Sequence, residues 1–153
     1  MVKTENHVPA FESTLQTTHE WLRELEKVAQ LRTQNEAYIV LRSVLHTLRD
    51  RMPADEAVHL GAQLPMLIRG FYFEGWKPSA TPKKQRSLKS FLDSMDPLPK
   101  PYDSFDAEEA VRSVFQLLDH RIQGGELDDV RDAMPEEVRA LWRPHERFTG
   151  VNA

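Results

Sequence analysis

The stretch Leu41-Arg42-Ser43-Val44-Leu45 returns 70 residues later as Val111-Arg112-Ser113-Val114-Phe115, with no gap between the two registers. At the same offset Pro65 meets Pro135, and most of the matched positions are apolar in both stretches. The apolar positions recur every three or four residues, which places their side chains on one face of an α-helix. The match therefore predicts an internal repeat built from helices.

We place the two repeats at residues 11–80 and 81–150, and expect tails at 1–10 and 151–153. Pro65 predicts a break between the third helix of the first repeat and a short fourth helix, because its ring clashes with the preceding turn. A repeat of about 70 residues is marginally stable alone. We therefore predict a single all-α domain, a helical bundle in which the two tandem repeats pack on their apolar faces. The predicted core positions, each with its counterpart 70 residues later, are Leu22, Leu41, Val44, Leu48, Leu60, Leu64 and Ile68.

Composition narrows the class of protein. The chain has 153 residues, of which 40% are hydrophobic and 29% are charged, as expected for one globular domain. The absence of cysteine excludes disulfides and thiolate metal sites. A net charge of −4 argues against a general nucleic-acid binder. No apolar run has the length of a membrane span, and no signal peptide is evident at the N-terminus, so we expect a cytoplasmic protein.

The sequence resembles the bacterial family catalogued as domain of unknown function 2267. The residues that carry the resemblance run from Ala107 to Arg112, from Gly124 to Leu127 and from Met134 to Trp142. The first repeat is similar at Gly61–Pro65 and Arg69–Trp76. The resemblance implies an all-α bacterial cytoplasmic protein, and it brings no catalytic residues to transfer.

Histidine and carboxylate residues on two predicted helices are candidates for a metal site. His46 and Asp50 lie one helical turn apart, and His19, Glu20 and Glu24 lie on a neighbouring predicted helix. Such a set is conceivable as a site between two helices. However, these residues lie off the main apolar stripe, where polar side chains normally face water. We therefore predict no metal and no cofactor.

Nucleophilic catalysis has no motif in this chain. Ser43 and Ser113 recur in both repeats, but each lies in mid-helix without a Gly-x-Ser-x-Gly turn. No glycine-rich phosphate loop is present either. The sequence thus predicts no catalytic residue and a protein that is not an enzyme.

Lysines and arginines gather in the turn-rich stretch 75–84 and just after it. They could contact phosphate on a nucleic acid or a lipid head group, but we favour a solvated linker that self-repulsion keeps extended. The cluster consists of Lys77, Lys83, Lys84, Arg86 and Lys89.

Two charged pairs recur in the repeats. Arg51 and Glu56 match Arg121 and Glu126, and each pair is separated by a predicted turn. Ligand binding is one explanation for their recurrence, but we favour structural ion pairs that join the second helix of each repeat to the third.

An aromatic segment ends the first repeat. Phe71, Tyr72, Phe73 and Trp76 lie within six residues, whereas the matched end of the second repeat keeps only Trp142. Aromatic side chains presented together are typical of binding surfaces, so these four residues form the candidate binding surface. Alternatively, Tyr72 and Trp76 fold back as a lid over the seam between the repeats, which we favour.

These observations favour a small non-enzymatic interaction or scaffold module that binds an unidentified protein, with a homodimer as one arrangement. A ligand-binding or regulatory module, with a pocket between the repeats or beneath Trp76, is the alternative from another class. An enzyme that the motifs do not reveal comes third.

Overall fold

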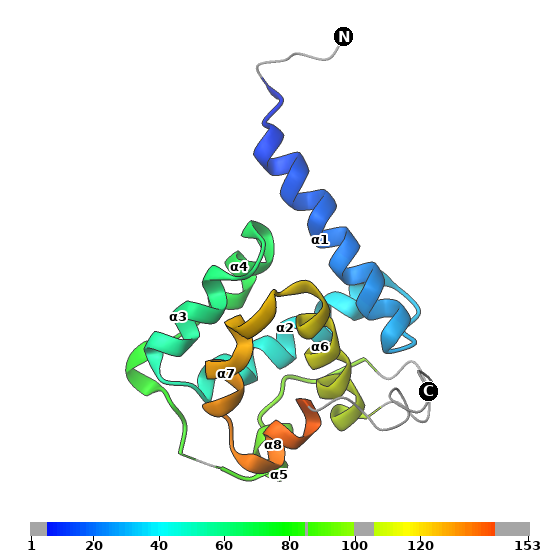
Figure 1. Ribbon diagram of the computed structural model, residues 1–153. Helices are drawn as coiled ribbons and strands as arrows, with labels where there is room; N and C mark the ends of the chain where they lie inside the picture. Colours follow the sequence, from blue (N-terminus) through cyan, green and yellow to red (C-terminus); the bar gives the residue numbers. More distant parts are fainter. Residues whose placement is uncertain (1–5, 85, 100–105, 143–153) are drawn as a thin grey trace.

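The computed structural model describes residues 6–84, 86–99 and 106–142, and every regular element in these ranges is helical (Figure 1). The fold is all-α, as the sequence predicted. Its α-helices are α1 (Pro9–Val28), α2 (Gln34–Asp50), α3 (Ala54–Ala62), α4 (Met66–Phe73), α5 (Leu88–Asp93), α6 (Ala107–Arg121), α7 (Asp128–Asp132) and α8 (Glu136–Arg139). Short 3₁₀ helices are η2 (Pro78–Ala80), η3 (Gly124–Leu127) and η4 (Ala140–Trp142).

The predicted tails fall largely outside the described residues. Residues 1–5 and 151–153 lie outside them, as do residues 143–150 of the second predicted repeat. Helix α1 begins at Pro9, inside the predicted tail of residues 1–10. A proline is well tolerated at the first helical position, because its missing N–H has no intrahelical partner there.

Local sequence signals explain where several helices begin. The Thr33 hydroxyl accepts a hydrogen bond from the Glu36 backbone N–H at 3.1 Å at the start of α2. The Asp106 carboxylate does the same for the Glu109 N–H at 2.9 Å at the start of α6. Both are N-caps that satisfy an otherwise unpaired donor. Pro65 and Pro135 directly precede α4 and α8, so the predicted break after the third helix is confirmed.

The core lies around α2, which packs against α1, α4 and α6. All seven core positions predicted in the first repeat are buried. Six of their seven counterparts are buried as well, namely Val111, Val114, Leu118, Val130, Met134 and Val138. The seventh, Leu92 on α5, is half-buried and packs against the same core.

Helices of the second half follow those of the first at a similar spacing. Helices α2, α3 and α4 correspond in order to α6, η3 with α7, and α8 with η4. Helix α2 packs against α6, and α3 packs against α7. The first helices differ most, because α1 has 20 residues and α5 has six. The superposition of the two halves as equal units stays a prediction.

Candidate functional sites

The aromatic segment packs mainly inward. Tyr72 is fully buried, and its hydroxyl donates to the Ala57 carbonyl at 2.7 Å. Burial raises the pKa of the Tyr72 phenol above its ordinary value. Tyr72 therefore cannot present its ring to a partner, which corrects its inclusion in the candidate surface. Ile68 and Tyr72 lie on the buried face of α4, whereas Leu67 points outward. The rotation of α4 about its axis therefore turns the Tyr72 ring into the core.

The other three aromatic side chains are half-buried and rest on neighbouring rings. Phe71 meets Tyr38 edge to face, with ring centroids 5.2 Å apart. Phe73 lies between Tyr72 and Trp76, with centroids 4.8 and 5.4 Å from its own. These contacts leave only part of each ring for a partner.

Neither predicted ion pair is present among the described residues. Arg51 turns toward α5, where its Nη2 donates to the Ser94 hydroxyl at 2.8 Å and the Ser90 carbonyl at 3.2 Å. Its guanidinium also lies over the Phe91 ring, 5.8 Å from the centroid. The predicted Arg51–Glu56 pair was therefore wrong, because the packing of α5, which the sequence does not reveal, determines where the arginine points.

The second pair fails for a similar reason. Arg121 donates to the Glu24 carboxylate of α1 at 2.7 Å, and Glu24 also lies 2.7 Å from His120. Glu126 lies 3.4 Å from His59 of α3. Arg121 and Glu126 thus pair with charged groups of other helices instead of with each other. Both contacts join a residue of the first half of the chain to a residue of the second half.

The residues considered for a metal site have separate partners. His19 lies 2.6 Å from the Gln34 side chain, while Glu24 is engaged with α6. The His46 Nε2 lies 2.6 Å from the Phe71 carbonyl, so this nitrogen must carry the proton and donate it. Within the described part of the chain, no group of three histidine, aspartate or glutamate side chains could hold a metal ion.

A polar cavity of about 180 Å³ lies where the end of α2 meets the chain on both sides of α5. We call it the α2–α5 cavity. Arg49, one of its charged residues, is buried and donates to Asp50 at 2.9 Å and to the Tyr72 carbonyl at 2.6 Å. The lining residues are His46, Thr47, Arg49, Asp50, Arg51, Lys83, Ser94 and Asp96.

Burial favours the neutral form of the His46 imidazole beside this cavity. Burial lowers the pKa of its imidazole below the ordinary value, and the positive charges of Arg49 and Arg42 act in the same direction. The hydrogen bond to Phe71 and the charge of Asp50 oppose this shift. Sequence reasoning missed the cavity because its residues come from three segments that are far apart in the chain.

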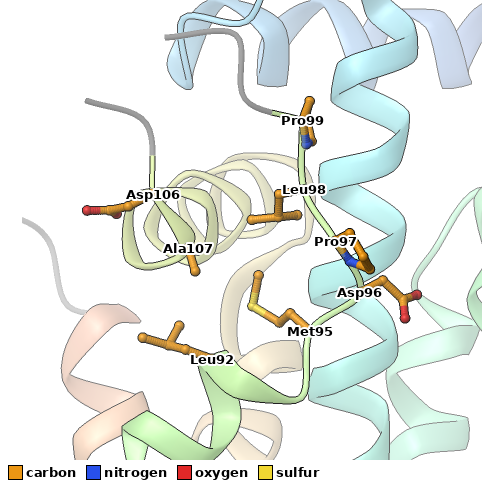
Figure 2. A pocket seen from close by; sticks show the side chains of 8 residues that line it. All are labelled: Leu92, Met95, Asp96, Pro97, Leu98, Pro99, Asp106 and Ala107. Atoms are coloured by element: carbon orange, nitrogen blue, oxygen red, sulfur yellow. The ribbon is translucent and has the colours of Figure 1, made fainter. Parts of the chain in front are cut away.

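A second, more apolar pocket of about 280 Å³ lies between α5 and the start of α6 (Figure 2). Figure 2 shows Leu92, Met95 and Leu98 around the pocket, with Ala107 opposite. Pro99 and Asp106 complete its rim and flank residues 100–105, which lie outside the described part of the chain.

Exposed apolar side chains gather where α1 meets α4. The exposed fractions are 62% for Phe11, 50% for Leu15, 51% for Met66 and 43% for Leu67. The Thr14 hydroxyl accepts a hydrogen bond from the Leu67 backbone N–H at 3.1 Å, so the two helices touch at this point. We call these four side chains the α1–α4 strip.

The exposed residues of α1 continue a stripe that is buried farther along the same helix. Phe11, Leu15, Thr18, Leu22 and Leu25 follow at intervals of four, three, four and three, which keeps them on one face. The last three are buried, and the first two are exposed. Figure 1 shows why, because the N-terminal part of α1 extends beyond the other helices.

Comparison with known proteins gives one family. The model of the family described as "Uncharacterized conserved protein (DUF2267)" matches residues 18–141. No curated protein matches the chain. The matched range begins after Phe11 and Leu15, so the exposed half of the α1 stripe lies outside it.

None of the helices in the described ranges combines the length and the apolar character needed to cross a bilayer.

Proposed function

The chain belongs to the DUF2267 family of uncharacterised conserved proteins. Because this family description names no function, we propose one from the side chains that the surface of the protein exposes. The protein is a non-enzymatic interaction module of the bacterial cytoplasm, and its binding surface is the α1–α4 strip. The partner that fits this surface best is a second copy of the chain.

The observation that carries the proposal is the continuation of the α1 stripe beyond the core. Leu22 and Leu25 are buried by the protein's own helices, but Phe11 and Leu15 of the same face are exposed. An apolar stripe with this spacing is the surface that one helix offers to another. Met66 and Leu67 widen it, and clustered exposed apolar side chains mark interaction sites more often than scattered ones do.

Charge supports a second copy as the partner. From Val8 to Thr18 the only charged side chain is that of Glu12. On α4, Met66 and Leu67 are followed by Arg69, which donates to carbonyls of its own chain. A two-fold interface places the same patch on both copies, so a strip with few charges can meet itself without repulsion. A strongly charged partner would find no complementary charge here.

The shape of α1 supports the same arrangement. Its N-terminal part extends beyond the other helices (Figure 1), which leaves this part of α1 open to a second copy of the same helix. In this arrangement Phe11 of one copy packs near Leu15, Met66 and Leu67 of the other, and the exposed stripe becomes covered.

Molar mass measured over a range of protein concentrations tests the proposal. Sedimentation equilibrium of the wild-type chain is expected to show a concentration-dependent rise from 17.7 kDa toward twice that mass. The double variant Phe11→Gln/Leu15→Gln removes the apolar side chains while keeping good helix formers, and it is expected to stay monomeric. Val58→Gln, at an exposed apolar residue of α3, is the matched control and is expected to associate like the wild type. A wild-type chain that is monomeric throughout, or a double variant that still associates, would overturn the proposal.

A second candidate function is a small-ligand-binding module, and the α2–α5 cavity favours it. The cavity lies between residues of the first predicted repeat, such as Arg51, and residues of the second, such as Ser94 and Asp96. Converging polar groups in a concave site are what a small-molecule site requires. Binding of a ligand there does not depend on the α1–α4 strip, so the two functions can be tested separately.

A further inference from the structure

Arg51 brings a buried positive charge to the α2–α5 cavity. Its side chain is 1% exposed, and its Nη2 is the only guanidinium nitrogen with a hydrogen-bond partner among the described residues. Those partners, the Ser94 hydroxyl and the Ser90 carbonyl, are both neutral. Burial also lowers the pKa of the Arg51 guanidinium. A buried cation is costly unless an opposite charge compensates it.

The carboxylates that line the cavity are engaged with other arginines. Asp50 acts on Arg51 through its charge, but it lies 2.9 Å from the Arg49 Nε, its ion-pair partner. Asp96 lies 3.5 Å from the Arg42 guanidinium. Neither carboxylate forms an ion pair with Arg51 in the described part of the chain.

Lys83 adds a second cation without a carboxylate. Its backbone N–H donates to the Asp50 carbonyl at 2.9 Å, and this bond holds the residue beside the end of α2. The Lys83 side chain is exposed, lines the cavity and makes no ion pair with a described residue. The cavity therefore combines a buried guanidinium with an accessible ammonium group.

We propose that the α2–α5 cavity binds a small oxyanion of the phosphate class. Lys83 donates hydrogen bonds to it from the mouth, while Arg51 supplies buried positive charge that no carboxylate in the described part of the chain pairs. A volume of about 180 Å³ is below the roughly 300–1,000 Å³ of sites for drug-sized ligands, so the site takes one phosphate-sized group. This proposal rests on the second candidate function and is independent of self-association.

Titration with inorganic phosphate tests the site directly. The full chain is titrated at constant ionic strength, with sodium chloride as the reference salt, and binding is followed by ³¹P NMR and by the midpoint of thermal unfolding. Wild-type protein is expected to bind saturably, and its midpoint is expected to rise with phosphate concentration, because a ligand that binds only the folded state stabilises it.

Two matched lysine variants identify the site. Lys83→Gln is expected to weaken phosphate binding by about tenfold or more, as the loss of a charge-assisted hydrogen bond requires. Lys84→Gln makes the same change of charge at the next residue, which does not line the cavity, and is expected to bind like the wild type. Both positions are exposed, so both variants should fold.

Three results would overturn the proposal: no saturable binding by the wild type, an equal effect of chloride, or equal binding by the two lysine variants. Glycerol phosphate then separates the sources of the ligand. Lys83-dependent binding as tight as that of inorganic phosphate assigns the site to a phosphate group on a larger molecule, and Lys83-dependent binding of inorganic phosphate alone assigns it to the free ion. Molar mass measured on the same samples reports the α1–α4 strip separately.

Discussion

The Arg69 Nη2 donates to the Leu64 carbonyl at 2.9 Å, so the guanidinium reaches back across Pro65 to the turn that follows α3. Its Nε donates to the Gly61 carbonyl at 3.0 Å. Carbonyl groups at a helix C-terminus have no intrahelical partner, and arginine side chains can satisfy them. Seventy residues later, Arg139 donates to the Met134 carbonyl at 3.3 Å in the same way. The recurrence of this arginine thus has a local structural cause.

Replacement of Arg69 by methionine tests this cap. Arg69→Met keeps an apolar stem and removes both hydrogen bonds, so we expect a loss of about 1–2 kcal/mol in the free energy of unfolding, measured in urea. Arg139→Met should cost less, because a single longer bond is lost. Lys84→Met, at an exposed cation, is the control. Equal stabilities of Arg69→Met and this control would contradict the capping role.

Leu48 and Leu118 occupy matched positions in the two halves, and both are fully buried. Each leucine-to-alanine substitution should reduce the free energy of unfolding by about 2–5 kcal/mol, the range for a buried leucine. Chemical denaturation measures both. A nearly neutral effect at either position would mean that the apolar stripe on that helix does not form the core.

His46 predicts a specific dependence of stability on pH. Because burial lowers its pKa in the folded state, the unfolded state binds a proton more readily. Stability should therefore fall as the pH drops below the ordinary value of 6.5, and level off below the folded-state pKa. His46→Gln should remove this part of the pH dependence. Denaturation curves of both proteins, recorded over about three pH units around the ordinary histidine pKa, give the difference. Parallel stability profiles would exclude His46 as the cause.

Tyr72 and Trp76 test how the aromatic segment is used. Tyr72→Ala should cost about 3–5 kcal/mol, comparable with other large aromatic deletions in a core. Trp76→Ala should cost less, because the ring is half-buried and lies against Phe73 alone among the described rings. Thermal unfolding of the two variants provides the comparison. An unchanged unfolding midpoint in Tyr72→Ala would restore the view of this segment as a binding surface.

Periodicity predicted the core because it depends on which residues share a helix face. It placed Leu41, Val44 and Leu48 on one face of α2, and all three are buried. Periodicity does not report how far a covering helix extends, however. Phe11 continues the same α1 face as Leu22 and is nevertheless exposed, because α1 extends beyond its neighbours.

Side-chain direction across a turn was harder to predict. Arg51 and Glu56 are close in sequence, but the arginine turns to Ser94 on the other side of the cavity. The choice depends on the position of α5, which lies about 40 residues away in the chain and is fixed by tertiary packing. For the same reason the α2–α5 cavity has no sequence motif.

The distance between two copies tests the central claim, self-association through the α1–α4 strip, most directly. The chain has no cysteine, so Gln16→Cys provides a single site for a nitroxide spin label beside Leu15. Double electron–electron resonance is expected to show dipolar coupling between labels on two copies, at a shorter distance than for labels at Val58→Cys. Adding Phe11→Gln and Leu15→Gln should abolish the coupling. Absence of coupling in the labelled wild-type background, or coupling that survives these two substitutions, would contradict the account.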